Sequence, residues 1–216
     1  MKVDVRGEVC PYPELRAIEA MKRALPDEVV EVFTDHAPAL ETIPVQAERL
    51  GFTVNIDKME SAEWRITLAR TIQMLSADSP TNKKRVTIIL HSGAYDRASY
   101  ALSLAMTALA MEAEVYMFLT YGGLKRFTKG CLENLEEETD SKMTNVISRG
   151  LKTGLIKPLE EQLVNARKLG LKLYACPGTM AQMNIVRSEL SQEVDEVMGL
   201  AIFLNLALKA AINWYI

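Results

Sequence analysis

In the first part of the chain, short alternations of apolar and charged residues are separated by apolar stripes with helical spacing. The pattern predicts the order strand, helix, strand, helix, strand, strand. One stripe predicts a helix over Glu14–Leu25. A second helix is expected from about Ile43, with Pro44 in its first turn, to Gly51. Two helices on one face of four strands form a two-layer α/β sandwich.

The second part of the chain has near-continuous apolar runs, which are typical of strands covered on both faces. The expected elements are, in order, a strand over Arg85–His91, a helix over Tyr95–Met111, a strand over Glu114–Thr120, a helix over Pro158–Leu169, a strand over Leu171–Ala175, a further helix, a short strand near Glu196–Met198 and a final helix within the apolar stretch Gly199–Ile216. This alternation predicts a doubly wound, flavodoxin-like parallel sheet.

Small and polar residues around Pro80 predict a linker over residues 71–83. We therefore expect one domain at 1–70 and another at 84–216. Within the second domain, the acidic run Glu136–Glu138 is expected to form a solvated helix face or a mobile insertion.

The composition narrows the possible functions. The chain has 216 residues, 49% of them hydrophobic, and a net charge of −3, which disfavours direct nucleic-acid binding. Three cysteines without a Cys-x-x-Cys pair, together with two histidines, argue against a disulfide scaffold and against a metal site. The charged start Met1–Arg6 is unlike a secretory signal, and Lys209 disfavours a membrane span at the C-terminus. We expect a cytoplasmic protein.

Cys10 comes directly before Pro11-Tyr12-Pro13, between the first strand and the first helix. Prolines in the first turn of a helix lose no helical hydrogen bond, so Cys10 is expected at the N-cap. The positive end of the helix dipole favours a thiolate there, and the thiolate is the reactive form of cysteine. The alternative is an inert cysteine that packs beside the helix.

Cys176 also precedes a proline, directly after a predicted buried strand, and is likewise expected at the N-terminus of a helix that favours its thiolate. Open α/β sheets bind ligands at the carboxyl ends of their strands, where His91-Ser92-Gly93 and Tyr121 are also expected. His91 is a candidate base beside Cys176, or a merely hydrogen-bonded histidine.

Cys131 is expected at the start of a helix, beside Lys125, Arg126 and Lys129. Positive charges favour the thiolate, which would make Cys131 a second sulfur acceptor or a resolving thiol. The alternative is a cysteine that packs a helix.

The segment Asp4–Pro13 resembles the signature D-x-R-G-x-x-C-P-x-P of the TusA/SirA sulfur-carrier proteins. The resemblance covers about residues 2 to 70 and includes Arg6, Pro11 and Pro13. It implies that Cys10 carries a persulfide and passes its outer sulfur to a partner protein.

Residues 84 to 216 resemble the DsrE-like sulfur-relay family more loosely. The resemblance runs through Ile89–Gly93, Gly122–Leu124, Ala175–Cys176 and Val197–Leu204. It implies that Cys176 accepts sulfur as a persulfide. Pro177 and Gly178 depart from the pattern expected after that cysteine.

Together these features predict sulfur transfer by a persulfide relay between Cys10 and Cys176, without a metal, flavin or nucleotide. The expected partners are sulfur-donor and sulfur-acceptor proteins, and the apolar C-terminal segment predicts a homo-oligomer. A non-catalytic adaptor, or a small-molecule-binding protein of sulfur or selenium metabolism, is the alternative. RNA binding by the first domain is a weaker one, which the near-zero charge disfavours.

Overall fold

The computed structural model describes residues 1–9, 11–60, 62–70 and 84–216. The chain divides into two compact units, Met1–Thr81 and Asn82–Ile216. The predicted linker at 71–83 lies outside the described residues, as does Cys10. Each unit has a sheet of its own.

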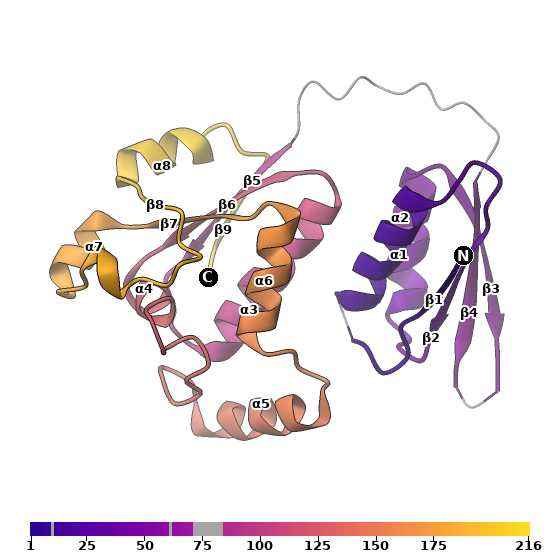
Figure 1. The fold of residues 1–216 in the computed structure, drawn as a ribbon, viewed down its shortest axis with the longest axis horizontal. Helices are drawn as coiled ribbons and strands as arrows, with labels where there is room; N and C mark the ends of the chain where they lie inside the picture. Colours follow the sequence, from indigo (N-terminus) through magenta and orange to yellow (C-terminus); the bar gives the residue numbers. More distant parts are fainter. Residues whose placement is uncertain (10, 61, 71–83) are drawn as a thin grey trace. The chain divides into compact units, whose positions relative to one another are not determined.

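The first unit is a two-layer α/β sandwich, as predicted (Figure 1). Its strands follow the order β1-β2-β4-β3, in which β1 is parallel to β2 and the other neighbours are antiparallel. Helices α1 and α2 pack side by side on one face, and the valines of β2 with Ile66 and Leu68 form the buried side of the sheet. The elements are β1 (Lys2–Asp4), α1 (Tyr12–Arg23), β2 (Val30–Thr34), α2 (Ala39–Arg49), β3 (Phe52–Lys58) and β4 (Trp64–Arg70).

The predicted bounds of both helices in the first unit need correction. Helix α1 has Pro11 at its N-cap, and it ends before Leu25, which is exposed. Helix α2 begins four residues before the predicted Ile43, so Pro44 lies inside it. The reason is the buried stripe Ala39, Ile43 and Ala47, whose spacing of four extends the helix toward its N-terminus.

The second unit contains a five-stranded parallel sheet of order β8-β7-β6-β5-β9. Its helices and strands are β5 (Arg85–Leu90), α3 (Tyr95–Ala110), β6 (Glu114–Leu119), α4 (Tyr121–Arg126), α5 (Ser141–Thr153), α6 (Leu159–Leu169), β7 (Lys172–Ala175), α7 (Pro177–Gln182), the 3-10 turn Arg187–Glu189, β8 (Glu196–Val197), α8 (Leu200–Ala207) and β9 (Ile212–Tyr215).

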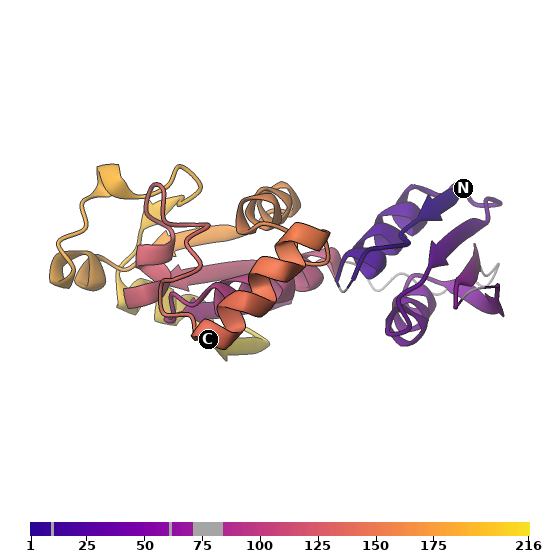
Figure 2. The same ribbon diagram turned by 90° about the horizontal axis from the view of Figure 1, so that it is seen from below.

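The strand order explains why helices cover both faces of this sheet. The chain steps outward from β5 to β8 and then returns to the other side of β5 for β9. Right-handed crossovers therefore place α3 and α6 on one face and α8 on the other (Figures 1 and 2). On the α8 face, the ring of Phe203 stacks on that of Phe118 at 4.5 Å. The predicted doubly wound sheet is confirmed.

The C-terminal segment is not a single final helix, contrary to the prediction. Helix α8 ends at Ala207, and β9 pairs in parallel with β5. The run Ile212–Ile216 is rich in aromatic and β-branched residues, which favour strands, and β5 offers an open edge of main-chain hydrogen-bonding groups.

The acidic run Glu136–Glu138 is neither a helix face nor a free insertion. It lies in a coil between α4 and α5, and Cys131 lies in a turn of this coil rather than at the start of a helix. Sequence periodicity missed this arrangement because the coil is held by hydrogen bonds to other segments.

Candidate functional site

The carboxyl ends of β5, β6 and β7 meet at one edge of the parallel sheet, because these strands are neighbours. They bring His91 and Ser92, Tyr121, and Cys176 to that edge. The strand order reverses between β5 and β9, so His91 also lies at the switch point where such folds bind ligands.

His91 stands in a cluster of aromatic rings. Its Nδ1 lies 3.2 Å from the hydroxyl of Thr120. The centroid of the Tyr121 ring lies 5.0 Å from that of the His91 ring. The Tyr215 ring stacks on the His91 ring, with 5.5 Å between their centroids. The main-chain N–H groups of His91 and Ser92 both donate to the Ile216 carbonyl. Tyr215 was missed from the sequence because its segment was assigned to a helix.

Tyr121 connects this cluster to the helix that follows Cys176. Its backbone has a φ of 43°, which is strained for a residue with a side chain. Its hydroxyl donates to the side-chain oxygen of Gln182 in α7 at 2.6 Å. The residue thus links His91 with α7.

Cys176 is a free, half-buried cysteine at the N-cap of α7. Its N–H donates to the Leu119 carbonyl at 3.1 Å, which ties the residue to the end of β6. The sulfur makes no capping hydrogen bond, and α7 has only six residues. A side chain on Gly178 would begin 3.8 Å from the sulfur, so glycine leaves that approach open.

In the first unit, the signature residues around Cys10 form a network of charges. The Arg6 guanidinium lies 2.5 Å from the Asp4 carboxylate and 3.1 Å from that of Glu63. Hydrogen bonds from Arg6 lower the pKa of Asp4 to about 2. The Gly7 N–H donates to the Asp35 carboxylate at 2.9 Å.

The prolines beside Cys10 are buried at the start of α1, with Pro11 at the N-cap and Pro13 in the first turn. The Tyr12 N–H donates to the Val9 carbonyl at 3.1 Å. Glu14 in the same turn is buried, and its desolvation raises the pKa of its carboxyl group. The N-cap of α1 is Pro11 rather than the predicted Cys10, and Cys10 itself lies outside the described residues.

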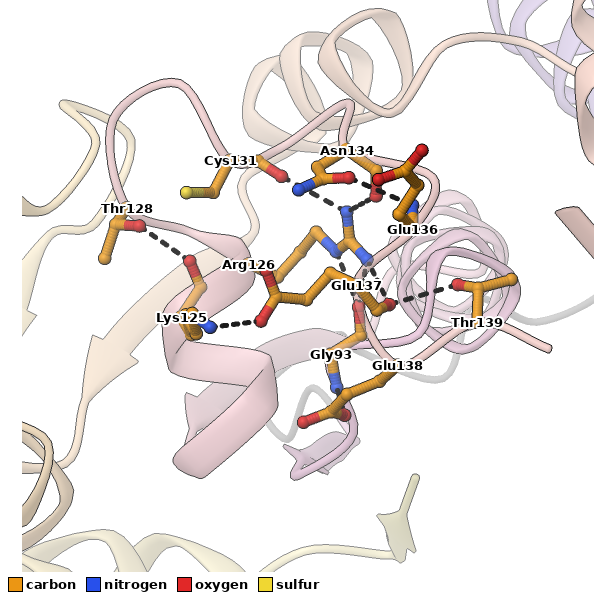
Figure 3. A network of polar contacts seen from close by, with 10 residues as sticks. All are labelled: Gly93, Lys125, Arg126, Thr128, Cys131, Asn134, Glu136, Glu137, Glu138 and Thr139. Carbon is orange, nitrogen blue, oxygen red and sulfur yellow. Dashed lines mark hydrogen bonds and ion pairs between the residues drawn. The ribbon is translucent and has the colours of Figure 1, made fainter. Parts of the chain in front are cut away.

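Arg126 organises the coil that carries Cys131 through a network of polar contacts (Figure 3), and its side chain is fully buried. All three of its nitrogens donate to main-chain carbonyls, and burial lowers the pKa of its guanidinium. The acceptors are the carbonyls of Gly93, Cys131, Leu132, Asn134 and Glu137. Within the described part of the chain, Arg126 has no carboxylate within ion-pair distance. Nothing in the local sequence distinguishes it from surface Arg residues.

Two carboxylates of the acidic run hold this coil against the carboxyl ends of the strands. The Glu137 carboxylate lies 2.5 Å from the Lys125 ammonium. The Glu138 carboxylate accepts a hydrogen bond from the Gly93 N–H at 2.6 Å. A Cβ on Gly122 would lie 2.4 Å from that carboxylate and 2.5 Å from the main-chain nitrogen of Gly93, which cannot move aside, so this approach requires glycine. The glycine pair after β6 therefore permits close packing.

Cys131 is a half-buried residue on the wall of a cavity of about 410 Å³. Its N–H donates to the Thr128 carbonyl, and its own carbonyl accepts from Arg126 at 3.1 Å. The sulfur points away from the guanidinium (Figure 3). The other wall comes from the segment after α7, which includes Met183, Ile185 and Glu189.

Across 1–9, 11–60, 62–70 and 84–216, no three His, Cys, Asp or Glu side chains are grouped as a metal site would require. No helix in these ranges combines the length and the apolar character needed to cross a membrane.

Family models match both units. Residues 1–70 match the family described as sulfurtransferase TusA, and residues 84–213 match the DsrE/DsrF-like family. The two matches occur in the N- to C-terminal order expected from the sequence.

Individual proteins are similar to one or both parts. A Thermotoga maritima protein named "Putative sulfur carrier protein" is 38% identical over 65 residues, which cover 30% of this chain and 82% of that protein. The uncharacterized protein YrkE of Bacillus subtilis is 30% identical over 156 residues, covering 62% of this chain and 97% of YrkE. The solved structure of YchN from E. coli covers 62% of this chain and 100% of YchN, with 12% identity and a TM-score of 0.42.

Proposed function

Because this chain belongs to the DsrE/DsrF-like family and begins with a TusA domain, we propose that it relays sulfur as cysteine persulfides between Cys10 and Cys176. The two family matches support a role in sulfur transfer. The assignment of the two cysteines and the persulfide chemistry are the proposed part.

The observation that carries the proposal is the position of Cys176. It is a half-buried, unpaired thiol at the carboxyl end of β7, on the sheet edge where doubly wound folds react. Gly178 leaves space beside its sulfur. Tyr121 connects α7 to His91, an ionisable group at the same edge. This arrangement suits a thiol that must meet a second sulfur from outside.

The proposed transfer follows the rules of thiol–disulfide exchange. A thiolate on the receiving cysteine attacks the outer sulfur of the loaded cysteine. One S–S bond forms as the other breaks, the loaded cysteine leaves as a thiolate, and the proton of the receiving thiol passes to solvent or to that thiolate. The step needs no resident metal, flavin or nucleotide.

Single-thiol proteins test the relay directly. The Cys131→Ser/Cys176→Ser protein, which keeps Cys10, is loaded with inorganic polysulfide and separated from the donor. It is then mixed with the Cys10→Ala/Cys131→Ser protein, which keeps Cys176 and differs from the first protein in mass by one oxygen atom, so that the two proteins are distinguished in the spectrum. We expect the mass of one sulfur atom to move between the two in intact-mass spectra, and the reverse mixture tests the other direction.

The control receiver carries serine at all three cysteine positions and should gain no sulfur. If both single-thiol proteins accept sulfur from polysulfide but neither passes it to the other, the relay is refuted. If neither protein accepts sulfur at all, the non-catalytic adaptor becomes the better explanation.

We also propose that the second unit forms a homo-oligomer through α8 and β9. Three apolar side chains of α8 and that of Leu208, the residue after its end, are more than half exposed. The three in the helix are Leu200, Ile202 and Leu204. Among the described residues, β9 pairs with β5 alone, so its other edge is open. Light scattering should show an oligomer that Ile202→Glu/Leu208→Glu dissociates, whereas Leu155→Glu, also at an exposed position, should not. A monomeric unmodified chain would refute this proposal.

A further inference from the structure

Cys176 does not line the cavity beside Cys131, so the proposed relay gives this cavity no role. Its volume of about 410 Å³ falls within the range of small-molecule sites, about 300–1,000 Å³. A thiol, two lysines and a thioether line it, from Cys131, Lys125, Lys129 and Met183. It therefore combines a nucleophile, positive charge and apolar surface in one concave site.

The walls of the cavity are held in place by hydrogen bonds. The Lys129 N–H donates to the Glu189 carbonyl at 2.8 Å, and the Ser191 N–H donates to the Phe127 carbonyl at 2.9 Å. These bonds join the Cys131 coil to the segment after α7. Arg126 holds the Cys131 carbonyl from the other side at 3.1 Å. The thiol is thus presented by a preorganised backbone, which favours binding of a small ligand.

The cavity is lined by two lysines and one glutamate, Lys125, Lys129 and Glu189, so the net charge of its lining is positive and favours an anion. Lys125 is paired with Glu137 at 2.5 Å, and the Glu189 carboxylate accepts from the Val186 N–H at 2.7 Å. Lys129 lies two residues from Cys131 and has no ion pair within the described ranges of the chain. Its ammonium is therefore available to attract a carboxylate on an incoming molecule. Met183 and Ile185 provide soft and apolar contacts for sulfur.

We infer that this cavity binds the persulfide of a small, carboxylate-bearing thiol, and that Cys131 accepts the outer sulfur of that donor. The inference rests on the proposed function in sulfur transfer. The Cys131 thiolate attacks the outer sulfur of R–S–S–H, so a Cys131 S–S bond forms and the bond from that sulfur to R–S breaks. The small thiol leaves as R–S⁻ and takes up the proton that Cys131 released. The sulfur changes carrier without an external oxidant or reductant.

The charge preference is tested in the full chain with Cys10→Ser and Cys176→Ser, where Cys131 is the remaining thiol. Two methanethiosulfonate reagents are compared, one with an anionic sulfonate group and one with a cationic trimethylammonium group. We expect the anionic reagent to be preferred by about 3-fold, as one exposed charge allows. Lys129→Gln should abolish the preference, whereas Lys168→Gln, at an exposed position on α6, should leave it unchanged.

Sulfur loading is tested on the same protein with glutathione persulfide, which bears carboxylates, and with cysteamine persulfide, which is cationic. Peptide mass spectra should locate one added sulfur on Cys131, with faster loading from glutathione persulfide. Equal rates from the two donors, or an unmodified Cys131, would overturn the inference.

The two proposals fail in different ways. If polysulfide-loaded Cys10 and Cys176 exchange sulfur while Cys131 stays unmodified, the inference alone is wrong. If Cys131 takes sulfur while Cys10 and Cys176 exchange none, the relay is wrong, and the cavity inference stands as a sulfur-accepting site.

Discussion

Each unit contains an arginine a few residues before a cysteine, and the two arginines work in opposite ways. Arg6 is exposed and bound by the carboxylates of Asp4 and Glu63. Arg126 is fully buried and bound by main-chain carbonyls. Breaking an exposed ion pair costs little stability, because water replaces the lost partner. Removing one partner of a buried, hydrogen-bonded cation costs much more, because the groups left behind remain buried without a partner. The same residue type thus forms exposed ion pairs in one unit and holds buried main-chain carbonyls in the other.

The glycines near the two arginines differ in the same sense. A Cβ on Gly7 would meet no atom within 4 Å, although its φ is +78°. A Cβ on Gly123 would lie 2.2 Å from the Leu90 carbonyl oxygen. The segment before Cys10 therefore borders open space, whereas the segment before Cys131 crosses the end of β5 at close range.

The largest effect should come from removing the buried cation. Arg126→Ala leaves five main-chain carbonyls without their donor and should lower the free energy of unfolding of the second unit by about 3–5 kcal/mol. Each unit has one tryptophan, Trp64 and Trp214, so urea unfolding can be followed for one unit at a time. The measurement uses Trp214 fluorescence in a Trp64→Phe background.

Arg126→Lys is the matched control for this prediction. It keeps the positive charge but offers fewer donors, so it should recover only part of the loss. Unfolding of the first unit, followed by Trp64 fluorescence in a Trp214→Phe background, should not change. A loss below about 1 kcal/mol for Arg126→Ala would mean that water replaces the guanidinium without difficulty.

The glycine contrast should give the next largest effect. Gly123→Ala forces α4 away from the end of β5 and should cost about 2–4 kcal/mol, because a well-packed backbone crossing cannot yield locally. Gly7→Ala should cost only the strain of its positive φ, about 1–2 kcal/mol. Equal losses in the two urea unfolding curves would show that the crossing at Gly123 is not rigid.

Glu14 should give a smaller effect with a characteristic pH dependence. Burial raises the pKa of its carboxyl group above the ordinary 4.5, so the folded state holds its proton more tightly than the unfolded state. The stability of the first unit should therefore fall as pH rises from 4.5 through the raised value. Glu14→Gln should remove this slope and should gain at most about 1 kcal/mol at neutral pH, because a hydrogen bond with the Gln46 side chain offsets part of the desolvation of the carboxylate.

The readout for Glu14 is Trp64 unfolding in urea at a series of pH values. Glu19→Gln, on the exposed side of the same helix, is the control and should keep the slope. A slope that persists in Glu14→Gln would assign the titration to another group.

The smallest effect is expected at the exposed ion pair between Arg6 and Asp4. The pKa of Asp4 is lowered from 3.8 to about 2, so its contribution is present above pH 3.8 and is lost as pH falls toward 2. Because both side chains are about half exposed, Asp4→Asn should cost less than about 1 kcal/mol at pH 7. The difference should vanish below about pH 2 and should shrink in high salt. A larger loss, or one that salt does not change, would remove the contrast with Arg126.

Much of the fold could be predicted because its signals are local. The helix stripes and buried runs placed α3, β5, β6 and α6 within one or two residues. The Cys-Pro sequence before α7 correctly placed Cys176 at a helix N-cap. The errors lie where burial in the folded unit decides which residues belong to an element. Pro44, which was expected in the first turn of its helix, lies inside α2 because the buried stripe begins at Ala39.

The candidate site was predictable only in part. Parallel strand ends converge by geometry, so His91, Tyr121 and Cys176 were expected at one edge of the sheet. Tyr215 reaches the same edge through β9, whose pairing with β5 joins residues more than 120 positions apart, as in the contact between Thr87 and Asn213. No periodicity within a short window reports such a partner.

The amino-acid sequence by itself determined the two α/β units, the order of their main elements and the family to which each unit belongs, because these follow from local periodicity and short motifs. Only the tertiary structure decided that Arg126 is buried, that the acidic run closes over Gly93 and that Cys131 lines a cavity. The physical reason is that burial and hydrogen-bond partners depend on segments far apart in the chain. The local sequence around these lysines, glutamates and arginines is equally compatible with a solvated surface, and only the fold shows which of them have partners.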